Sequence, residues 1–230
     1  MMTHIVITGA SRGIGAAIAK ALTAGTNRIV ALSSTDGDLS DPAAPARLWE
    51  ASLDRLDGRI DVLINNAGVF EANPIADDDG NWLAGWNRTM QVNLTAAADL
   101  CRRAVLHWQD RAAPGRIVNI ASRAAYRGDS PAHWHYAASK SGLVAMTKTI
   151  ARAYAKEGIL AFAICPGFTM TGMADDYLES RGGAKLLTDI PLGRVTMPEE
   201  VGEMARWCAL DAPASMTGAV LDVNGASYVR

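Results

Sequence analysis

The stretch HIVITGASRGIG, residues 4–15, decides the fold of this chain of 230 residues. His4 to Thr8 is a short apolar, β-branched run that predicts a buried strand, and the Ala-rich segment 14–23 has helical spacing. Glycine permits a sharp turn and a close backbone approach, and a helix N-terminus offers free N–H groups to a phosphate. The turn therefore predicts a phosphate-binding loop, with a tight packing turn that binds no ligand as the alternative. Its glycines are Gly9, Gly13 and Gly15.

Short apolar runs alternate with helical segments along the rest of the chain. Because strands joined through helices form parallel sheets covered on both faces, this order predicts a doubly wound α/β sheet, a Rossmann fold, as a single domain over residues 1–230. Loop 169–191, rich in Gly, Asp and Met, is expected to be the most mobile element and a candidate lid. The expected strands are 28–32, 60–64, 116–120, 160–164 and 219–223, and the expected helices are 42–56, 82–110 with a break in its first third, 136–156 and 198–210.

Composition and charge argue against several classes of protein. The net charge of −2 and the scattered Lys and Arg residues give no basic surface for nucleic acid. Cys101, Cys165 and Cys208 are far apart and lack CxxC spacing, which predicts neither disulfides nor a thiolate metal site and fits a reducing cytoplasm. No export signal is recognised in the sequence, and no uncharged run approaches about 18 residues. We therefore expect a cytoplasmic protein with no nucleic-acid partner and no membrane span.

Tyr136 and Lys140 lie four residues apart in the segment YAASK, with Ser122 upstream at the end of an apolar run. Positions i and i+4 share one face of a helix, so the ammonium would lie beside the phenol. A nearby positive charge stabilises the phenolate and lowers its pKa, which makes a tyrosine a usable acid or base. The same spacing also occurs in ordinary solvated helix pairs. The pair is a hypothesis that other motifs must support.

Five motifs supply that support, in the order of a known family. They are TGASRGIG (8–15), NNAG (65–68), Asn93 within QVNL, Ser122 after RIVNIA, and YAASK (136–140), followed by Pro166 and Gly167 after the next strand. In these motifs the chain resembles the short-chain dehydrogenase/reductase family, of the compact kind that includes 3-oxoacyl-carrier-protein reductases, over nearly its whole length. The resemblance implies an NAD(P)-dependent oxidoreductase that transfers a hydride between the cofactor and a ketone or secondary alcohol, with a 3-oxoacyl thioester as one candidate substrate.

The resemblance also implies catalytic roles. Tyr136 would be the general acid in carbonyl reduction and the base in alcohol oxidation. Lys140 would lower the pKa of Tyr136 and hydrogen-bond the nicotinamide ribose, and Ser122 would donate to the substrate oxygen. Asn93 would hold a water that links Lys140 to solvent. Taken alone, a serine at a strand end is usually a cap or turn residue, and an asparagine inside a helix can stabilise a kink.

The cofactor-binding residues implied by the resemblance come from several segments. Asn65 is expected to be partly structural, with its side chain bracing neighbouring strands. The implied residues are Gly9, Ser11, Arg12, Gly13, Ile14 and Gly15 in the glycine-rich turn; Ser33, Ser34, Asp38 and Leu39 after the second strand; Asn65, Ala67 and Gly68 in NNAG; and Tyr136, Lys140, Pro166, Gly167 and Thr169.

The end of the second strand bears on the identity of the cofactor. An acidic residue there would select NAD, whereas a nearby arginine favours the 2′-phosphate of NADP. The strand ends at Ser33 and Ser34, with Arg12 in the glycine-rich turn, so NADP is preferred. Asp36 keeps NAD as the alternative, because a shift of two residues would bring it to the ribose.

The segment after the second strand is shorter than the resemblance implies. The family usually places a helix and a third strand before the acidic turn, but here the turn at 38–41 follows almost at once. We expect the helix to be missing and the third strand to be reduced or lost. A partner subunit or a rearranged loop would then cover the exposed sheet edge.

His133, Trp134 and His135 precede Tyr136 and are candidate linings of a substrate pocket. The His-x-His pattern also suggests zinc, but no third ligand with sensible spacing accompanies it, so no metal site is expected. The remaining histidines, His4 and His107, are expected to be surface or capping residues.

Two further alternatives concern function and assembly. A dinucleotide-binding regulatory or structural protein of the same fold remains open, although such relatives usually lose the Tyr or the Lys. An enoyl reductase is disfavoured, because the resembling enzymes place more residues between these two. Relatives usually pair through two long helices, here 82–110 and 136–156, so a homo-oligomer, a tetramer or dimer, is expected. Ala137, Ser141 and Ala145 would allow close helix approach.

Overall fold

The computed structural model describes residues 2–23, 25–171 and 187–230. Within them a parallel sheet of six strands runs in the order β2-β1-β3-β4-β5-β6. This arrangement confirms the predicted doubly wound sheet of the Rossmann type. The strands are β1 (His4–Ile7), β2 (Arg28–Ala31), β3 (Val62–Asn65), β4 (Gly115–Ile120), β5 (Ile159–Pro166) and β6 (Val220–Val223).

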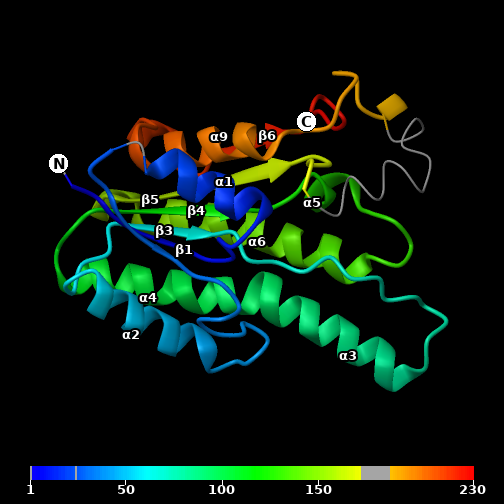
Figure 1. The fold of residues 1–230 in the computed structure, drawn as a ribbon, viewed down its shortest axis with the longest axis horizontal. Coiled ribbons are helices and arrows are strands. Elements are labelled where there is room, and N and C mark those ends of the chain that lie inside the picture. Colours follow the sequence, from blue (N-terminus) through cyan, green and yellow to red (C-terminus); the bar gives the residue numbers. More distant parts are fainter. Residues whose placement is uncertain (1, 24, 172–186) are drawn as a thin grey trace.

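Helices cover both faces of the sheet (Figure 1). α1 (Gly13–Leu22) and α9 (Pro198–Leu210) pack together on one face. The other face carries α2 (Ala44–Arg55), α4 (Ala96–Asp110) and α6 (Trp134–Tyr154). Each strand therefore contributes side chains to the hydrophobic cores on both faces of the sheet.

Alternation along the strands decides which core a residue joins. In β1, Ile5 and Ile7 pack with α1 and α9, whereas Val6 packs with α2 and α4. Trp108 of α4 is fully buried in the core on the face of α2 and α4, where its Nε1 donates to Ile60 O at 2.7 Å. Burial of a side chain of this size contributes about 1.5–3 kcal/mol, so these paired cores hold the sheet between its helices.

The region after β2 is short, as the sequence predicts. In the described part of the chain no strand lies beyond β2, and the loop leads into α2 without an intervening helix. Successive aspartates hold this loop by accepting backbone N–H groups: Asp36 from Ser33 at 2.8 Å, Asp38 from Ser40 at 2.9 Å, and Asp41 from Ala43 at 2.9 Å. Such turns replace a whole helix and strand with local hydrogen bonds.

The long helix predicted over residues 82–110 begins earlier, and the break predicted in its first third occurs at residues 91–95. α3 (Asp79–Met90) starts after Asp78, whose carboxylate accepts the N–H of Asn81 at 3.0 Å. A π-helical turn, η1 (Gln91–Thr95), then joins α3 to α4. Turns of this kind are frequent at functional sites, and this one contains Asn93.

Other boundaries differ from the sequence prediction by small amounts. α6 begins two residues before Tyr136 and ends in the short helix η2 (Ala155–Glu157). A one-turn helix, α5 (Ala124–Arg127), follows Ser122 and was not predicted, because four residues give no periodic pattern. η3 (Ala214–Met216) precedes β6. Most of the predicted mobile lid, residues 172–186, lies outside the described residues.

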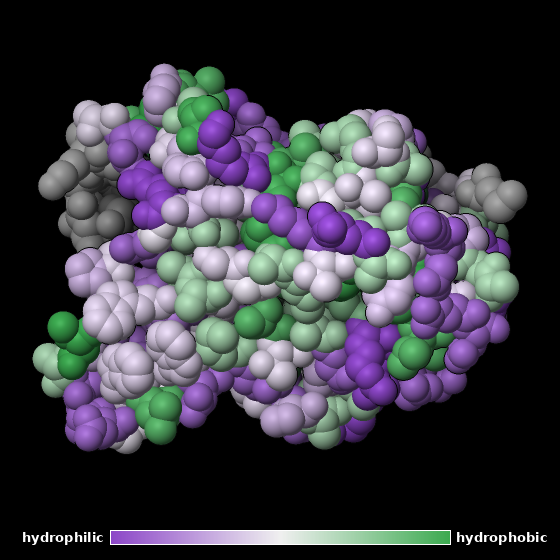
Figure 2. All heavy atoms as spheres, turned by 180° about the vertical axis from the view of Figure 1, so that it is seen from behind, coloured by the Kyte–Doolittle hydropathy of each residue, from purple (hydrophilic) through white to green (hydrophobic). Residues whose placement is uncertain are grey.

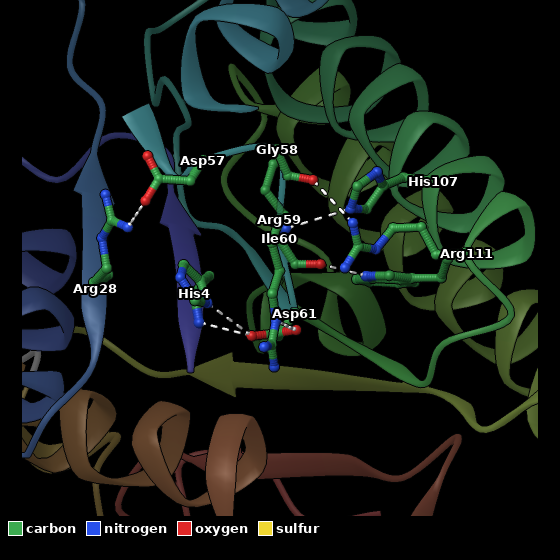
Figure 3. Close-up of polar contacts among 10 residues, drawn as sticks. His4, Arg28, Asp57, Gly58, Arg59, Ile60, Asp61, His107 and Arg111 are labelled. Carbon is green, nitrogen blue, oxygen red and sulfur yellow. Dashed lines mark hydrogen bonds and ion pairs between the residues drawn. The ribbon is translucent and has the colours of Figure 1, made fainter. Parts of the chain in front are cut away.

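Polar contacts tie together the edge of the sheet where the strands begin (Figure 3). Asp61 accepts the backbone N–H of His4 at 2.8 Å and lies 3.3 Å from His4 Nδ1. His107 Nε2 accepts the N–H of Ile60 at 3.3 Å, and burial lowers the pKa of His107. The prediction that these two histidines are surface or capping residues is wrong for His4, which is buried in β1.

Of the helices in residues 2–23, 25–171 and 187–230, none has the length and hydropathy needed to cross a bilayer. Figure 2 shows the side opposite to that of Figure 1, where strongly hydrophobic residues are scattered among pale and hydrophilic ones.

Candidate active site

A cleft of about 760 Å³ opens at the carboxyl ends of β1, β2 and β3. Parallel α/β sheets bind their ligands at this edge, and the volume is within the usual range for a cofactor site. Twelve of the residues implied by the resemblance line it. They are Gly9, Ser11, Arg12, Gly13, Ile14, Gly15, Ser33, Ser34, Asp38, Leu39, Ala67 and Gly68.

The glycine-rich turn leaves no room for side chains at two positions. Gly9 has a φ of +65°, and a Cβ there would lie 2.7 Å from Ala67 Cα. A Cβ on Gly15 would lie 2.1 Å from the carbonyl oxygen of Gly9. At the N-terminus of α1, Arg12 makes no side-chain cap, and the first turn carries no acidic residue. The first N–H groups of this helix are therefore available to an anion such as a pyrophosphate.

The NNAG segment is bonded to that turn. Thr8 Oγ1 accepts the backbone N–H groups of Asn66 and Ala67, both at 3.1 Å. In return, Asn66 Nδ2 donates to the carbonyl oxygens of Gly9 at 2.8 Å and Thr8 at 3.1 Å. These reciprocal bonds make two motifs that are distant in sequence into one wall of the cleft.

Asn65 does not line the cleft. Its side chain is buried and donates to Asn119 Oδ1 at 2.8 Å, and Asn119 in turn donates to Thr147 Oγ1 at 2.8 Å. The chain of bonds joins β3 to β4 and β4 to α6. Of the two roles predicted for Asn65, bracing neighbouring strands and binding the cofactor, the structure shows the first.

The end of β2 presents hydroxyl groups and not a free carboxylate. Asp36 Oδ2 accepts the N–H of Ser33 at 2.8 Å and its Oγ at 3.0 Å, and Asp36 Oδ1 lies 3.8 Å from Arg55. The backbone hydrogen bond from Ser33 is the main cause that holds the pKa of Asp36 below its usual value. Ser33, Ser34 and Arg12 line the cleft, whereas Asp36 is occupied within its own turn.

Arg88 of α3 also lines the cleft and was not predicted. It pairs with Glu71, Nε to Oε2 at 3.1 Å and Nη2 to Oε1 at 3.3 Å, and this hydrogen-bonded pair raises the pKa of Arg88. The one sequence signal that could have pointed to Arg88 is its helical spacing. Arg88 lies one turn before Val92, which also lines the cleft. Further lining residues outside the prediction are Thr8, Leu32, Gly37, Leu48, Asn66, Val69 and Thr171.

Tyr136, Lys140 and Ser122 meet at the end of β4. The Lys140 ammonium lies 5.8 Å from the centroid of the Tyr136 ring and donates to the carbonyl oxygen of Ile120 at 2.9 Å. The Ser122 side chain hydrogen-bonds to Tyr136, and Ser122 Oγ also accepts the N–H of Ala124 at 3.1 Å. The structure therefore brings together the three residues that the sequence singled out.

Burial dominates the protonation of this pair. It raises the pKa of Tyr136 to about 12, and the hydrogen bond from Ser122 acts in the opposite direction. Burial also lowers the pKa of Lys140 to about 8. Desolvation is the largest influence on the phenol here, and the expected lowering of its pKa by Lys140 stays a prediction. The phenol is protonated at neutral pH, which is the form that can donate to a carbonyl oxygen.

Asn93 connects the π-helical turn to the loop after NNAG. Its Oδ1 accepts the N–H of Val69 at 2.8 Å, and its Nδ2 donates to Val69 O at 3.0 Å and to Ser139 Oγ at 3.3 Å. A Cβ on Gly68 would lie 3.3 Å from Asn93 Oδ1 and 3.4 Å from Lys140 Nζ. Asn93 and Lys140 thus lie on the same side of Gly68, where a Cβ would be in tight contact with the Asn93 amide.

Pro166, Gly167 and Thr169 lie at the carboxyl end of β5, outside the cleft itself. Gly167 donates its N–H to Val223 O at 2.9 Å, and Thr169 Oγ1 donates to Gly167 O at 3.1 Å. Tyr136 and Lys140 are also not among the residues that line the cleft. These five residues lie at the carboxyl edge of the sheet, on the β4 and β5 side of the NNAG segment.

Aromatic rings lie next to Tyr136. Phe70, which the sequence did not single out, stacks on His133 with a centroid distance of 3.9 Å and meets Tyr136 edge to face at 4.8 Å. Trp134 is exposed and His135 is buried. The rings of His133 and His135 lie 6.3 Å apart, but no cluster of three or more His, Cys, Asp or Glu residues suited to a metal ion occurs in the described ranges.

Comparison with known proteins relates this geometry to established sequences. A family model described as "Enoyl-(Acyl carrier protein) reductase" matches residues 27–226. The 3beta-hydroxysteroid dehydrogenase 1 of Eggerthella lenta is 34% identical over 96% of this chain and 92% of its own length. A 3-oxoacyl-[acyl-carrier-protein] reductase of Synechocystis is 35% identical over 96% of this chain and 94% of its own.

A solved structure shares both the fold and a similar level of sequence identity. It is a putative NAD(P)-dependent gluconate 5-dehydrogenase of Beutenbergia cavernae, determined with bound NADP at low occupancy. It superposes with a TM-score of 0.87 at 31% identity and covers 97% of this chain and 95% of its own.

Proposed function

This chain belongs to the short-chain dehydrogenase/reductase family and is an NAD(P)-dependent oxidoreductase, and we propose that it transfers a hydride between NADP and a ketone or secondary alcohol. One observation carries the proposal. A half-buried Tyr136, hydrogen-bonded to Ser122 and next to the Lys140 ammonium, lies at the carboxyl edge of the sheet beside a cleft that fits a dinucleotide. A 3-oxoacyl thioester remains one candidate substrate.

Each residue of the site has a separate role in carbonyl reduction. When bound, the nicotinamide supplies the hydride in reduction and accepts it in oxidation. Ser122 donates a hydrogen bond to the substrate oxygen and orients it, and Tyr136 gives its phenolic proton to that oxygen as negative charge develops. Lys140 stabilises the phenolate that remains. Asn93 fixes the loop over Lys140 and, we propose, holds a water through which the proton is replaced.

The residues around the carboxyl end of β2 favour NADP as the cofactor. Arg12, Ser33 and Ser34 offer a cation and hydroxyl groups to a 2′-phosphate, while Asp36 is bonded within its own turn. A carboxylate held in this way does not reach out to ribose hydroxyls, which removes the usual means of selecting NAD. Pro166, Gly167 and Thr169 are proposed to contact the nicotinamide.

The proposal is tested by following NADPH consumption with a panel of carbonyl compounds. Tyr136→Phe should lower kcat by about 10²–10⁴, since general acid catalysis contributes that much. Tyr154→Phe, at the far end of α6, is the matched control and should leave the rate unchanged. Tight NADPH binding without turnover of any carbonyl, with Tyr136→Phe indistinguishable from wild type, would instead support the non-catalytic alternative.

We also propose that the protein works in the cytoplasm as a homo-oligomer, a tetramer or dimer, through α4 and α6. Ser141 and Ala145 are exposed on α6, where small side chains permit close helix packing. Leu106 of α4 is 43% exposed and would be covered by a second copy. Sedimentation as a monomer at micromolar concentration would contradict this assembly.

A further inference from the structure

A pair of stacked rings stands beside the catalytic tyrosine. Phe70 and His133 are nearly parallel, with 5° between their planes, and Phe70 meets the Tyr136 ring at 82°. Phe70 is nevertheless 51% exposed. His133 covers one face of Phe70, yet about half of the residue stays accessible beside Tyr136. Phe70 therefore presents apolar aromatic surface next to the proton donor.

Both rings are held in place before any substrate arrives. Asn93 binds both backbone groups of Val69, directly before Phe70. Asn73 donates its N–H to Ala132 O at 2.8 Å, which joins the loop of Phe70 to that of His133. A ligand that stacks on a fixed ring loses less freedom on binding than one that must order a loop, so the surface is preorganised.

The charges around this pair are balanced and do not single out an anionic substrate. Asp129 acts electrostatically on both His133 and Tyr136. Glu71, directly after Phe70, is paired with Arg88, and the Lys140 ammonium lies 5.8 Å from the centroid of the Tyr136 ring. The feature that distinguishes this side of the proton donor is therefore its aromatic surface, on which an apolar ring can stack.

We infer that Phe70, backed by His133, is the surface on which the substrate stacks, and that the enzyme acts on ketones or secondary alcohols carried by an apolar ring system. The inference rests on the proposed function and narrows its substrate class. It separates this chain from an enzyme for sugar acids, whose hydroxyl-rich substrates would need hydrogen-bonding partners in place of an aromatic surface. Sequence alone does not reveal the pair, because Phe70 and His133 lie 63 positions apart.

The test compares substrates matched in size. Wild type should reduce β-tetralone, a ring ketone, with a kcat/KM at least about tenfold above that of 2-decanone, a linear ketone with the same number of carbons. Phe70→Leu keeps an apolar side chain but removes the flat ring, and should lower kcat/KM for β-tetralone by about tenfold while changing that for 2-decanone less than about threefold. Trp86→Leu, which removes a ring stacked on Trp82 in α3, is the control and should change neither.

Equal kcat/KM values for the two ketones, or an equal loss on both in Phe70→Leu, would overturn the inference. Faster reduction of 5-ketogluconate than of β-tetralone would also overturn it. Calorimetric binding of the ring alcohol β-tetralol to the enzyme with NADPH, a pair that cannot react, gives a readout independent of turnover. If wild type turns over no carbonyl, the proposed function fails; the stacking surface then stands only if Phe70→Leu still weakens β-tetralol binding by about tenfold, and is refuted if binding is unchanged.

Discussion

Replacing Lys140 by methionine should stabilise the folded protein while it removes activity. Lys140 is buried on α6 and its pKa falls from 10.5 to about 8. The folded state therefore holds the charged form at a cost that the unfolded chain, where the ammonium is solvated, does not have. A methionine of similar length fills the space without a charge.

The size of the effect follows from the pKa. Each pH unit corresponds to about 1.4 kcal/mol, so burying the ammonium costs about 3 kcal/mol at pH values below 8. The variant also loses the hydrogen bond from Nζ to Ile120 O, worth about 1 kcal/mol. The net gain in the free energy of unfolding is about 2 kcal/mol. For a chain of this length that raises Tm by about 4–8 °C.

The gain should depend on pH in a defined direction. Between about pH 8 and 10.5 the unfolded chain keeps a proton that folded Lys140 has released, so the wild-type free energy of unfolding rises with pH and the penalty fades. At about pH 9.5 the advantage of Lys140→Met should fall below about 0.5 kcal/mol.

Urea unfolding of wild type and Lys140→Met near neutral pH and at about pH 9.5 measures both effects. Lys148→Met, exposed on the same helix, is the control and should change stability by less than about 0.5 kcal/mol. A Lys140→Met variant that is less stable than wild type near neutral pH, or whose advantage persists at the higher pH, would refute the reasoning.

Three further predictions concern the same site and its support. For carbonyl reduction, kcat/KM should hold steady below about pH 8 and fall above it as Lys140 loses its charge; a flat profile across that range would argue against the role given to the ammonium. Gly9→Ala places a Cβ 2.7 Å from Ala67 Cα at a φ of +65°, so it should cost about 2–4 kcal/mol of stability and weaken NADPH binding at least about tenfold in a fluorescence titration. An unchanged Kd for NADPH in Gly9→Ala would contradict this prediction. Asn119→Leu leaves the amide of Asn65 with only the weak acceptor Cys101 Sγ and should lower the free energy of unfolding in urea by about 1–3 kcal/mol; a midpoint equal to that of wild type would show that the bond contributes nothing.

Local patterns explain how much of this molecule could be read from its sequence. The strand, the glycine-rich turn and α1 follow one another within residues 4–22, so periodicity and glycine spacing were enough to predict them. The missing helix and strand after β2 were also predictable, since they are a matter of chain length. The spacing of Tyr136 and Lys140 correctly placed both residues on one helix that lies beside Ser122.

Features that depend on distant contacts were not predictable in the same way. Arg88 and Phe70 acquire their positions from loops and helices that meet only in the folded chain. The pKa of Tyr136 is set by desolvation, which has no counterpart in a sequence pattern, and so its direction was not foreseen. The sequence leaves Asp36 as a candidate NAD ligand, because its hydrogen bonds with Ser33 form only in the folded turn.

The most direct test of the account is transfer of deuterium to a ketone from NADPH that carries deuterium in place of both hydrogens of the reactive nicotinamide carbon. The account predicts that the alcohol product carries the label on its carbinol carbon, and that Tyr136→Phe forms this product about 10²–10⁴ times more slowly while still binding NADPH. Absence of label from the product, or an equal rate in Tyr136→Phe, would contradict a hydride-transfer site in which Tyr136 delivers the proton.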